Sequence, residues 1–295
     1  MEKFNGVKIA ETIIQKLKNQ EKQQKIFAAI LVGENPASLS FLKQKEKVAK
    51  ELGVDFRIYK FPENIKNDDL RKEVGKIALL KKVGGVIVQL PLPEHLNKHY
   101  ILNVIPREKD VDVLGERALG AFYAGRNPVL PPSVGVVEEI LKSYDLNLKS
   151  LKVAVVGAGF LIGKPIAIWL MDNPEGKPSA SYGARVKELS VFKNGSDLSE
   201  LKNFDLVISG VGQAGLIKPE MLKEGAGVID FGYNMKEIRN EKGEIRNEIY
   251  GDFDPSLISH LSSLSFYTPT PNGTGPILVA KIFENFYKLN QPLKQ

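Results

Sequence analysis

The chain has 295 residues, and 41 Lys and Arg against 35 Asp and Glu give a net charge of +6. Its apolar and charged fractions, 43% and 26%, are those of ordinary globular proteins and exclude a disordered or collagen-like chain. Cysteine is absent, which excludes disulfides, thiolate metal sites and cysteine nucleophiles. Neither a membrane-spanning apolar run nor a secretory signal is recognisable, so we expect a cytoplasmic protein with no membrane partner.

The first half of the chain alternates apolar runs with amphipathic segments. Strands are predicted at Ile26–Gly33, Val54–Phe61 and Val83–Leu90, with helices at Ala37–Leu52 and Asp68–Lys82 between them. This alternation is typical of βαβ units and predicts a mostly parallel sheet.

The second half repeats the pattern, and its predicted strands are Lys152–Val156, Arg185–Phe192, Leu206–Val211 and Val228–Phe231. A Gly- and Pro-rich stretch, Gly115–Ser133, separates the halves and is followed by a helix at Val134–Tyr144. We therefore predict an α/β protein of two domains with a cleft between them. An N-terminal α/β substrate domain spans residues 1–120, with the C-terminal helix of residues 276–295 packing back on it, and a Rossmann-type doubly wound domain spans residues 121–275.

A glycine-rich turn, Gly157-Ala158-Gly159 followed by Gly163, joins the strand Lys152–Val156 to a predicted helix. Such a turn presents backbone N–H groups and a helix N-terminus to a pyrophosphate, although a purely structural tight turn has the same pattern. The next strand ends in Lys193 rather than in an acid that would hold the ribose hydroxyls of NAD. This cation favours the 2′-phosphate of NADP, unless it is simply solvated.

Lys45 interrupts the apolar face of a predicted helix. At 100° per residue it shares that face with Ser38, Phe41, Val48 and Leu52. A lysine in this position either extends its ammonium group to solvent or is partly desolvated. In the second case its pKa is lowered, and it becomes able to donate and accept protons.

Two further polar segments follow predicted strands or loops. Gln89 lies at the carboxyl end of a strand, where ligands bind in open α/β sheets, or else it only terminates the strand. In Lys109-Asp110-Val111-Asp112 the two carboxylates are two residues apart, so an extended backbone would direct both to one side. An acidic loop of this kind also occurs without any function.

Together these segments resemble the methylenetetrahydrofolate dehydrogenase/cyclohydrolase family over nearly the whole chain. The matching motifs are Val32-Gly33-Glu34-Asn35-Pro36-Ala37-Ser38 with Lys45, Val88-Gln89-Leu90-Pro91-Leu92-Pro93, Lys109-Asp110-Val111-Asp112, Ile162-Gly163-Lys164-Pro165, Val228-Ile229-Asp230-Phe231-Gly232-Tyr233-Asn234, Gly251-Asp252-Phe253-Asp254, and Pro269-Thr270-Pro271 with Gly275-Pro276. The resemblance implies that Lys45 is the catalytic acid and base, that Gln89 holds and tunes it, and that Asp112 anchors the pterin ring.

The resemblance also implies two coupled reactions. NADP, or else NAD, would oxidise 5,10-methylenetetrahydrofolate to the methenyl cation, and water would then convert the cation to 10-formyltetrahydrofolate. The substrate-binding residues would be Phe41, Ser38, Leu90, Pro91, Pro271 and Gly275. The cofactor-binding residues would be Gly157, Ala158, Gly159, Gly163, Lys164, Pro165, Lys193, Gly212 and Asn234. A homodimer is implied, whereas neither a metal site nor a nucleic-acid partner is expected.

The chain departs from the family pattern at several positions. Phe41 replaces a tyrosine, Val113 a glycine, and Ser133 a threonine, while in the cofactor loop Ala158 replaces an arginine and Gly159 a serine. These departures leave two alternatives open: a folate- or nucleotide-binding homologue without catalysis, and a different NAD(P)-dependent dehydrogenase. The second alternative requires a catalytic His or Lys in the second domain or hinge, where His260 is the only histidine.

Overall fold

The computed structural model describes residues 4–171, 186–239, 245–256 and 264–291. Among these, the chain forms two compact units. One contains residues 10–132 and 279–291, and the other contains residues 4–9, 133–171 and 186–278. The division between them falls at Pro132, inside the Gly- and Pro-rich stretch Gly115–Ser133, which also contains a helix, α5 (Glu116–Tyr123).

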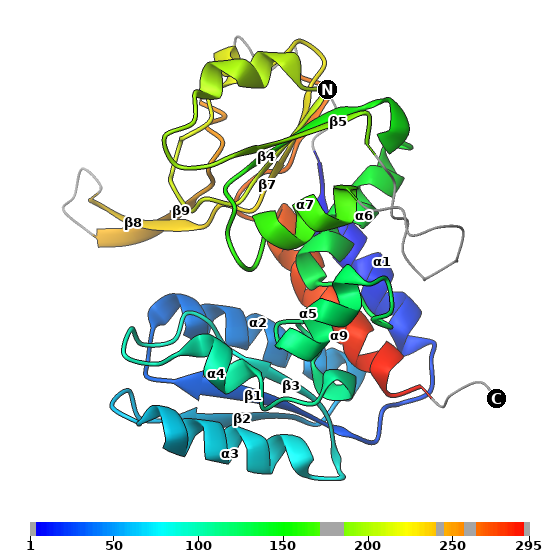
Figure 1. Cartoon of the computed structure of the whole chain (residues 1–295), viewed down its shortest axis with the longest axis vertical. Coiled ribbons are helices and arrows are strands. Elements are labelled where there is room, and N and C mark those ends of the chain that lie inside the picture. The colour runs from blue at the N-terminus through cyan, green and yellow to red at the C-terminus, as the bar shows by residue number, and fades with distance from the viewer. Residues whose placement is uncertain (1–3, 172–185, 240–244, 257–263, 292–295) are drawn as a thin grey trace. The chain divides into compact units, whose positions relative to one another are not determined.

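The first unit is built on a parallel sheet with the strand order β2-β1-β3 (Figure 1). Its strands are β1 (Ile26–Val32), β2 (Phe56–Phe61) and β3 (Val83–Val88), each close to its predicted range. Every residue of β1 and β3 is buried, which explains their continuous apolar sequence. The predicted parallel sheet is confirmed.

Helices α2 (Pro36–Leu52) and α3 (Asn67–Leu79) connect these strands. The start of α2 is fixed by the Asn35 side chain, which accepts a hydrogen bond from the Ser38 N–H, and its end by Gly53 in the left-handed conformation. Short helices α4 (Lys98–Leu102) and η1 (Arg107–Lys109) follow β3. Helix α1 (Gly6–Lys18), which the sequence analysis missed, buries Ala10, Ile13, Ile14 and Leu17.

The C-terminal helix α9 (Thr274–Leu289) begins in one unit and ends in the other. Its last two turns pack on β1, where the Phe286 ring stacks on Phe27 at 4.8 Å between centroids and Phe283 meets Phe27 edge-on at 5.4 Å. These contacts fix the end of α9 to the centre of the first sheet.

The second unit contains a five-stranded sheet, all parallel, with the order β10-β7-β6-β4-β5. The strands are β4 (Lys152–Val156), β5 (Glu188–Phe192), β6 (Leu206–Ser209), β7 (Gly227–Asp230) and β10 (Phe266–Tyr267). The chain reverses direction across the sheet between β4 and β6, and ligands of doubly wound folds bind beside such a point. The predicted α/β class is thereby confirmed.

Helices α6 (Pro132–Ser143) and α7 (Gly163–Met171) and the single-turn helices η2 (Leu148–Ser150), η3 (Leu198–Asn203) and η4 (Pro219–Met221) complete this unit. An antiparallel hairpin, β8 (Asn234–Arg239) with β9 (Ile245–Tyr250), was not predicted. Charged residues outnumber apolar ones in β8, so the strand carries little hydrophobic signal. None of the described helices is both long and apolar enough to cross a membrane.

Candidate functional site

Lys45 is buried on the inner face of α2, with 6% of its surface exposed. Its Nζ donates a hydrogen bond of 2.8 Å to Oε1 of Gln89, which directly follows β3. The Gln89 amide is oriented by its own Nε2, which donates to the Leu90 carbonyl at 3.0 Å. The Lys45 ammonium group therefore does not extend to solvent, and the side chain is held by a partner from the neighbouring strand end.

Burial lowers the pKa of Lys45 below its ordinary value of 10.5, and the carboxylate of Asp112 partly opposes this shift. Conversely, burial raises the pKa of Asp112, and Lys45 opposes that shift. Each group stabilises the charged form of the other, whereas the surrounding protein favours both neutral forms. A lysine with a lowered pKa loses its proton more readily than an exposed lysine, so it can both accept protons from and donate protons to a bound substrate.

Other predicted substrate-binding residues lie on the same elements. Ser38 shares the face of α2 with Lys45, and its Oγ, in a residue only 2% exposed, has no hydrogen-bond partner within the described part of the chain. Phe41 lies between them on that helix and is partly exposed. Leu90 and Pro91 follow Gln89, with Leu90 partly exposed and Pro91 exposed. The structure thus places polar and aromatic groups around Lys45, including one hydroxyl that is available to a ligand.

In the Lys109–Asp112 motif the structure gives each residue a different contact. Lys109 Nζ donates to the carbonyls of Ala78 and Leu80 at the end of α3. Asp110 is 2% exposed, and burial is the main reason that its pKa is raised to about 7. Its Oδ2 accepts hydrogen bonds from the backbone N–H groups of Leu114 and Gly115 rather than facing solvent. The carboxylates therefore differ in role: Asp110 holds the backbone, and Asp112 interacts with Lys45.

Val113 adopts a backbone conformation that L-residues avoid. Its φ is +57°, and its side chain is fully buried. A β-branched residue in this left-handed region costs about 1–2 kcal/mol, which a glycine does not incur. The departure from the family's glycine is therefore accommodated at a cost in free energy, directly beside Asp112.

The glycine turn of the second unit has the geometry expected of a dinucleotide loop. Gly157 has a φ of +94°, and a Cβ at Gly163 would lie 1.7 Å from the Gly157 carbonyl oxygen, so both positions require glycine. Helix α7 starts at Gly163, and Lys164 at its first turn is exposed while Pro165 is buried. The turn thereby brings the backbone close to the N-terminus of α7, as pyrophosphate binding requires.

Three residues in or beside this turn differ from the family pattern. Ala158 and Gly159 extend no polar side chain from it, and a Cβ on Gly159 would meet nothing nearer than 3.8 Å. Ser133, predicted as a replacement for a threonine, donates from its Oγ to the Leu161 carbonyl at 2.8 Å. Its hydroxyl supports the turn from the start of α6.

Lys193 directly follows β5 and is exposed. Its backbone N–H donates to the Ser196 Oγ at 2.9 Å, which fixes the tight turn that begins at this residue. The predicted cation therefore does stand at the carboxyl end of the strand next to β4.

Gly212 and Asn234, both predicted cofactor-binding residues, meet in the loop that follows β6. The Asn234 amide lies between the Gly212 carbonyl and the Ala214 N–H, at 2.5 and 3.1 Å in the orientation that satisfies both. Gly212 has a φ of +79° and no atom within 4 Å of an added Cβ. The structure brings these two predicted residues together, with Asn234 bracing the loop.

Sequence reasoning quoted the motifs of Asp252 and Asp230 but gave these residues no role. The Asp252 carboxylate accepts hydrogen bonds from the Ser209 Oγ and from three successive backbone N–H groups, those of Val211, Gly212 and Gln213. Asp230, whose pKa is raised to about 7 mainly by burial, accepts from the N–H groups of Gly232, Asp252 and Phe253. Asp252 thus shapes the loop after β6, and Asp230 holds the backbone of Asp252 itself. An aspartate that ends an apolar strand is the signal that could have revealed Asp230.

Pro271 and Gly275 lie in the second unit, in the segment leading into α9 and in its first turn. Pro271 is exposed and Gly275 is partly exposed.

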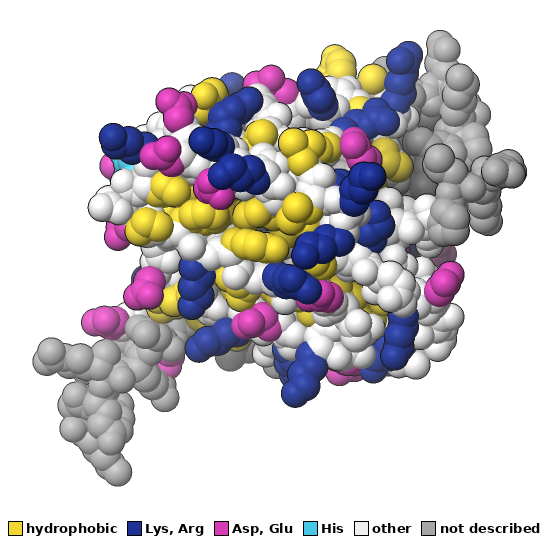
Figure 2. Space-filling view, turned by 90° about the horizontal axis from the view of Figure 1, so that it is seen from below, with side chains coloured by type: hydrophobic (Ala, Val, Ile, Leu, Met, Phe, Trp, Pro, Cys, Tyr) yellow, Lys and Arg dark blue, Asp and Glu magenta, His cyan; other side chains and the backbone are white. Residues whose placement is uncertain are grey.

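On the face of the molecule shown in Figure 2, Lys and Arg side chains are interspersed with Asp and Glu. Charges of both signs thus surround the apolar side chains on this face.

Comparison with known proteins matches both halves of the chain to domains of one enzyme family. Residues 4–112 match the family model described as tetrahydrofolate dehydrogenase/cyclohydrolase, catalytic domain, and residues 131–293 match that of its NAD(P)-binding domain. The "Bifunctional protein FolD" of Nitratiruptor sp. is 32% identical and covers 98% of this chain and 96% of its own. The protein of the same name from Campylobacter jejuni is 34% identical, with coverages of 96% and 94%.

Solved structures agree with this assignment. The crystal structure of the bifunctional enzyme FolD from Campylobacter jejuni has a TM-score of 0.82 at 32% identity and covers 97% of this chain and 96% of its own. A FolD from Trypanosoma brucei, complexed with NADP cofactor and inhibitor, has a TM-score of 0.84 at 24% identity, with coverages of 98% and 96%, and supports the fold alone.

Fold and site together define a two-part α/β protein in which a lysine-centred site on one parallel sheet is combined with an NAD(P)-binding domain. The chain belongs to the tetrahydrofolate dehydrogenase/cyclohydrolase family, as the sequence motifs predicted.

Proposed function

We propose that this protein is a bifunctional enzyme of one-carbon metabolism. It oxidises 5,10-methylenetetrahydrofolate to the methenyl cation with NADP⁺ and then hydrolyses the cation to 10-formyltetrahydrofolate. The observation that carries this proposal is the buried Lys45, hydrogen-bonded to Gln89 and electrostatically coupled to Asp112. Burying a lysine costs free energy. A protein that only binds folate gains nothing from this cost, whereas an acid–base catalyst needs the lowered pKa that burial produces.

Lys45 supplies the proton transfers of the hydrolysis. Water adds to the cationic methenyl carbon and loses a proton to the neutral amine. The bond from this carbon to one of its two nitrogens then breaks as that nitrogen takes a proton from the protonated amine. The hydroxyl group left on the carbon loses its own proton to solvent, and the resulting formyl group remains on the other nitrogen. Gln89 keeps the lone pair of Lys45 directed by accepting one of its hydrogens. Asp112 binds the pterin ring through its carboxylate.

The dinucleotide is held by the second unit. Gly157, Gly163 and the N-terminus of α7 hold the pyrophosphate, and the missing side chain of Gly212 leaves open space for the cofactor beside its loop. When bound, NADP⁺ supplies the acceptor for the hydride. The geometry fits this group because an added Cβ at Gly159 or Gly212 would meet no atom closer than 3.8 Å.

NADP is preferred to NAD in this proposal because Lys193 ends β5, where the ribose of the cofactor binds in such folds. Ala158 provides no guanidinium group for the 2′-phosphate, so a lysine point charge replaces the bidentate contact. We further propose a cytoplasmic homodimer whose product serves purine biosynthesis, and light scattering of the purified protein tests the dimer.

One assay tests the catalytic proposal. The protein is incubated with methylenetetrahydrofolate and either NADP⁺ or NAD⁺, while reduced nicotinamide and the methenyl product are followed separately. Hydrolysis is measured in the same preparation on added methenyltetrahydrofolate. Formation of reduced nicotinamide together with loss of the methenyl species is expected, whereas binding of a reduced folate without turnover would identify a non-catalytic homologue.

A further inference from the structure

Asp112 is carried by a loop rather than by a helix or strand. The Asp112 loop, residues 110–115, connects η1 to α5. The position of the carboxylate relative to Lys45 therefore depends on how the backbone of this loop is fixed. The left-handed Val113 makes this loop harder to hold, since the chain would relax from that conformation if its surroundings allowed it.

The loop is closed on itself by its first residue, Asp110. The Asp110 carboxylate accepts from the N–H groups of Leu114 and Gly115 at 3.0 and 2.7 Å. Asp110 itself forms a parallel β-bridge with Val86 of β3. This side of the loop is thus tied to the same strand that delivers Gln89.

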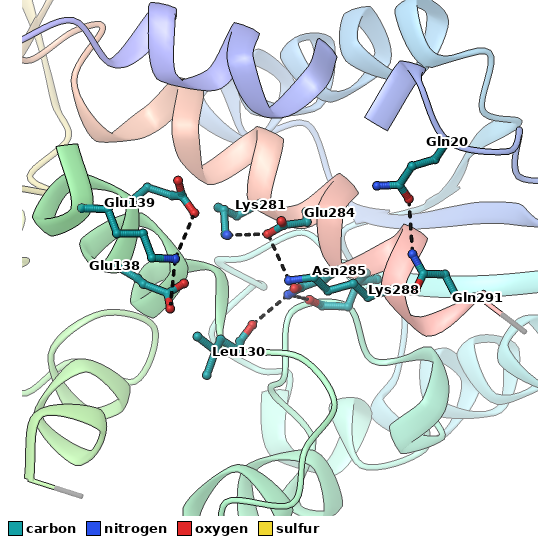
Figure 3. Close-up of polar contacts among 11 residues, drawn as sticks. Gln20, Leu130, Glu138, Glu139, Lys281, Glu284, Asn285, Lys288 and Gln291 are labelled. Atoms are coloured by element: carbon teal, nitrogen blue, oxygen red, sulfur yellow. Dashed lines mark hydrogen bonds and ion pairs between the residues drawn. The ribbon is translucent and has the colours of Figure 1, made fainter. Parts of the chain in front are cut away.

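A second attachment comes from Asn285 of α9, which is 3% exposed. Its Nδ2 donates to the carbonyls of Val111 and Leu130 at 2.9 and 2.8 Å, and Figure 3 shows its side chain directed toward Leu130. Both amide hydrogens are therefore used on the backbone. The Val111 carbonyl is part of the peptide group that joins Val111 to Asp112, so this hydrogen bond acts on the backbone directly beside the carboxylate-bearing residue.

Asn285 can hold the Val111 carbonyl in a defined position because its own helix is packed tightly against the sheet. The adjacent Phe286 stacks on Phe27 of β1. A Cβ at Gly85 of β3 would lie 2.7 Å from Phe286 and 3.2 Å from Val111, so strand, helix and loop meet without spare room. The amide is the polar contact within this apolar packing.

We propose that Asn285 is a positioning residue for Asp112: by bonding the Val111 and Leu130 carbonyls it sets the backbone that directs the Asp112 carboxylate toward Lys45 and the folate. This inference rests on the proposed function. It assigns a role in folate recognition to the C-terminal helix, which is far along the chain from Asp112. Asn285 touches no reacting atom and acts only through the loop.

The test compares two asparagines of the same segment. Asn285→Leu removes both donors from the Asp112 loop. Asn290→Leu is the matched control, because Asn290 Nδ2 also donates to two carbonyls, those of Gly84 and Phe286, but none of them belongs to the loop. For Asn285→Leu we expect the KM for methenyltetrahydrofolate to rise about ten- to a hundredfold, since displacements of about 1 Å have effects of this size. For Asn290→Leu we expect lower thermal stability with unchanged KM.

A second readout separates positioning from loss of stability. If the Asp112 carboxylate is displaced, it no longer raises the pKa of Lys45, and the ascending limb of the hydrolysis pH profile moves to lower pH. In an Asp112→Asn background, adding Asn285→Leu should then change neither KM nor the pH profile further. Additive effects of the two changes would overturn the proposal.

Asn285→Ser, which keeps one donor, is used if the leucine variant does not fold, and an intermediate KM is expected. Binding of 5-formyltetrahydrofolate, followed by calorimetry, provides a measure independent of turnover. An active wild-type protein whose Asn285 variants behave like Asn290→Leu would refute the positioning role alone. An inactive wild-type protein would instead refute the proposed function.

Discussion

The buried amine of Lys45 has its chemistry set by three neighbours of different kinds. The apolar face of α2 desolvates it, Gln89 orients it, and Asp112 adds a nearby negative charge. Burial acts against protonation and the carboxylate acts in favour of it, so the pKa reflects the difference between two opposing effects. Small changes in either neighbour should therefore alter the pH range in which the lysine exchanges protons.

Replacing Lys45 by methionine tests the role of the amine. Lys45→Met keeps a flexible side chain of similar length and removes the proton-transfer group, so we expect hydrolysis of methenyltetrahydrofolate to fall about a hundredfold or more. Thermal stability should be unchanged or higher, because a buried amine is replaced by an apolar group. Lys43→Met, an exposed lysine of the same helix, is the control and should retain full activity. Undiminished hydrolysis by a folded Lys45→Met protein would exclude Lys45 as the acid and base.

Replacing Asp112 by asparagine tests the electrostatic coupling. The carboxylate raises the pKa of Lys45, so Asp112→Asn should lower that pKa and move the ascending limb of the kcat/KM profile for hydrolysis to lower pH. The folate KM should rise about tenfold or more as a charged contact to the pterin is lost. Glu116→Gln, at an exposed carboxylate of the same region, should show neither effect. A profile that moves to higher pH would contradict the assigned coupling.

The elements of this fold were predictable where one force dominated. The fully buried strands β1 and β3 have continuous apolar sequences, and α2 begins at a strong N-cap. All three elements therefore lie close to their predicted ranges. Helix α5 lies in a stretch rich in glycine and proline, and the charged strand β8 is paired with β9, a partner that its own sequence does not indicate. Lys45, Gln89 and Asp112 could be proposed from motifs, whereas the contacts of Asp252 and Asn285 depend on residues distant in the sequence and required the structure.

The loop after β6 is shaped by a carboxylate instead of by its own sequence. Asp252 occupies the three successive N–H groups that an unfilled turn of this kind would offer to an anion. For Asp252→Asn we expect the free energy of unfolding to fall by about 1.5–3 kcal/mol, because one acceptor of a charge-assisted set is replaced by a donor.

The same change should weaken NADP⁺ binding about tenfold while leaving the folate KM unaltered, since the loop belongs to the NAD(P)-binding domain. Asp254→Asn serves as the control, because Asp254 Oδ1 accepts only from the Ser256 N–H and does not contact this loop's backbone N–H groups among the described residues. Urea unfolding and fluorescence titration measure the two effects. Equal losses for both ligands would show that Asp252 acts on the whole protein rather than on its loop.

At the scale of the whole molecule, the two units carry separate halves of the proposed reaction, and both contain departures from the family pattern. The lysine-centred unit retains Lys45, Gln89 and Asp112, whereas the cofactor turn has Ala158 and Gly159 in place of an arginine and a serine. Cofactor choice can therefore change without disturbing the hydrolytic site. In the proposed function, the positive charge at the end of β5 is what favours NADP over NAD.

Lys193 is the residue on which that choice should depend. A lysine binds a phosphate as a point charge with less geometric specificity than an arginine, so the parent protein should prefer NADP⁺ to NAD⁺ by a smaller margin than a guanidinium would give. Lys193→Ala removes one charge-assisted contact with the 2′-phosphate, and the NADP/NAD ratio of kcat/KM should fall about tenfold or more. Activity with NAD⁺, which has no 2′-phosphate, should change little.

Lys187→Ala is the matched control, because Lys187 is an exposed lysine that precedes the opposite end of β5. It alters the net charge by the same amount, and long-range attraction of a phosphate-bearing cofactor would be weakened equally by either variant. Turnover of methylenetetrahydrofolate with each cofactor is measured at low and physiological salt, since screening reduces the long-range effect more than the direct contact. A parent that prefers NAD⁺, or a ratio that Lys193→Ala and Lys187→Ala lower alike, would show that the end of β5 does not read the 2′-phosphate.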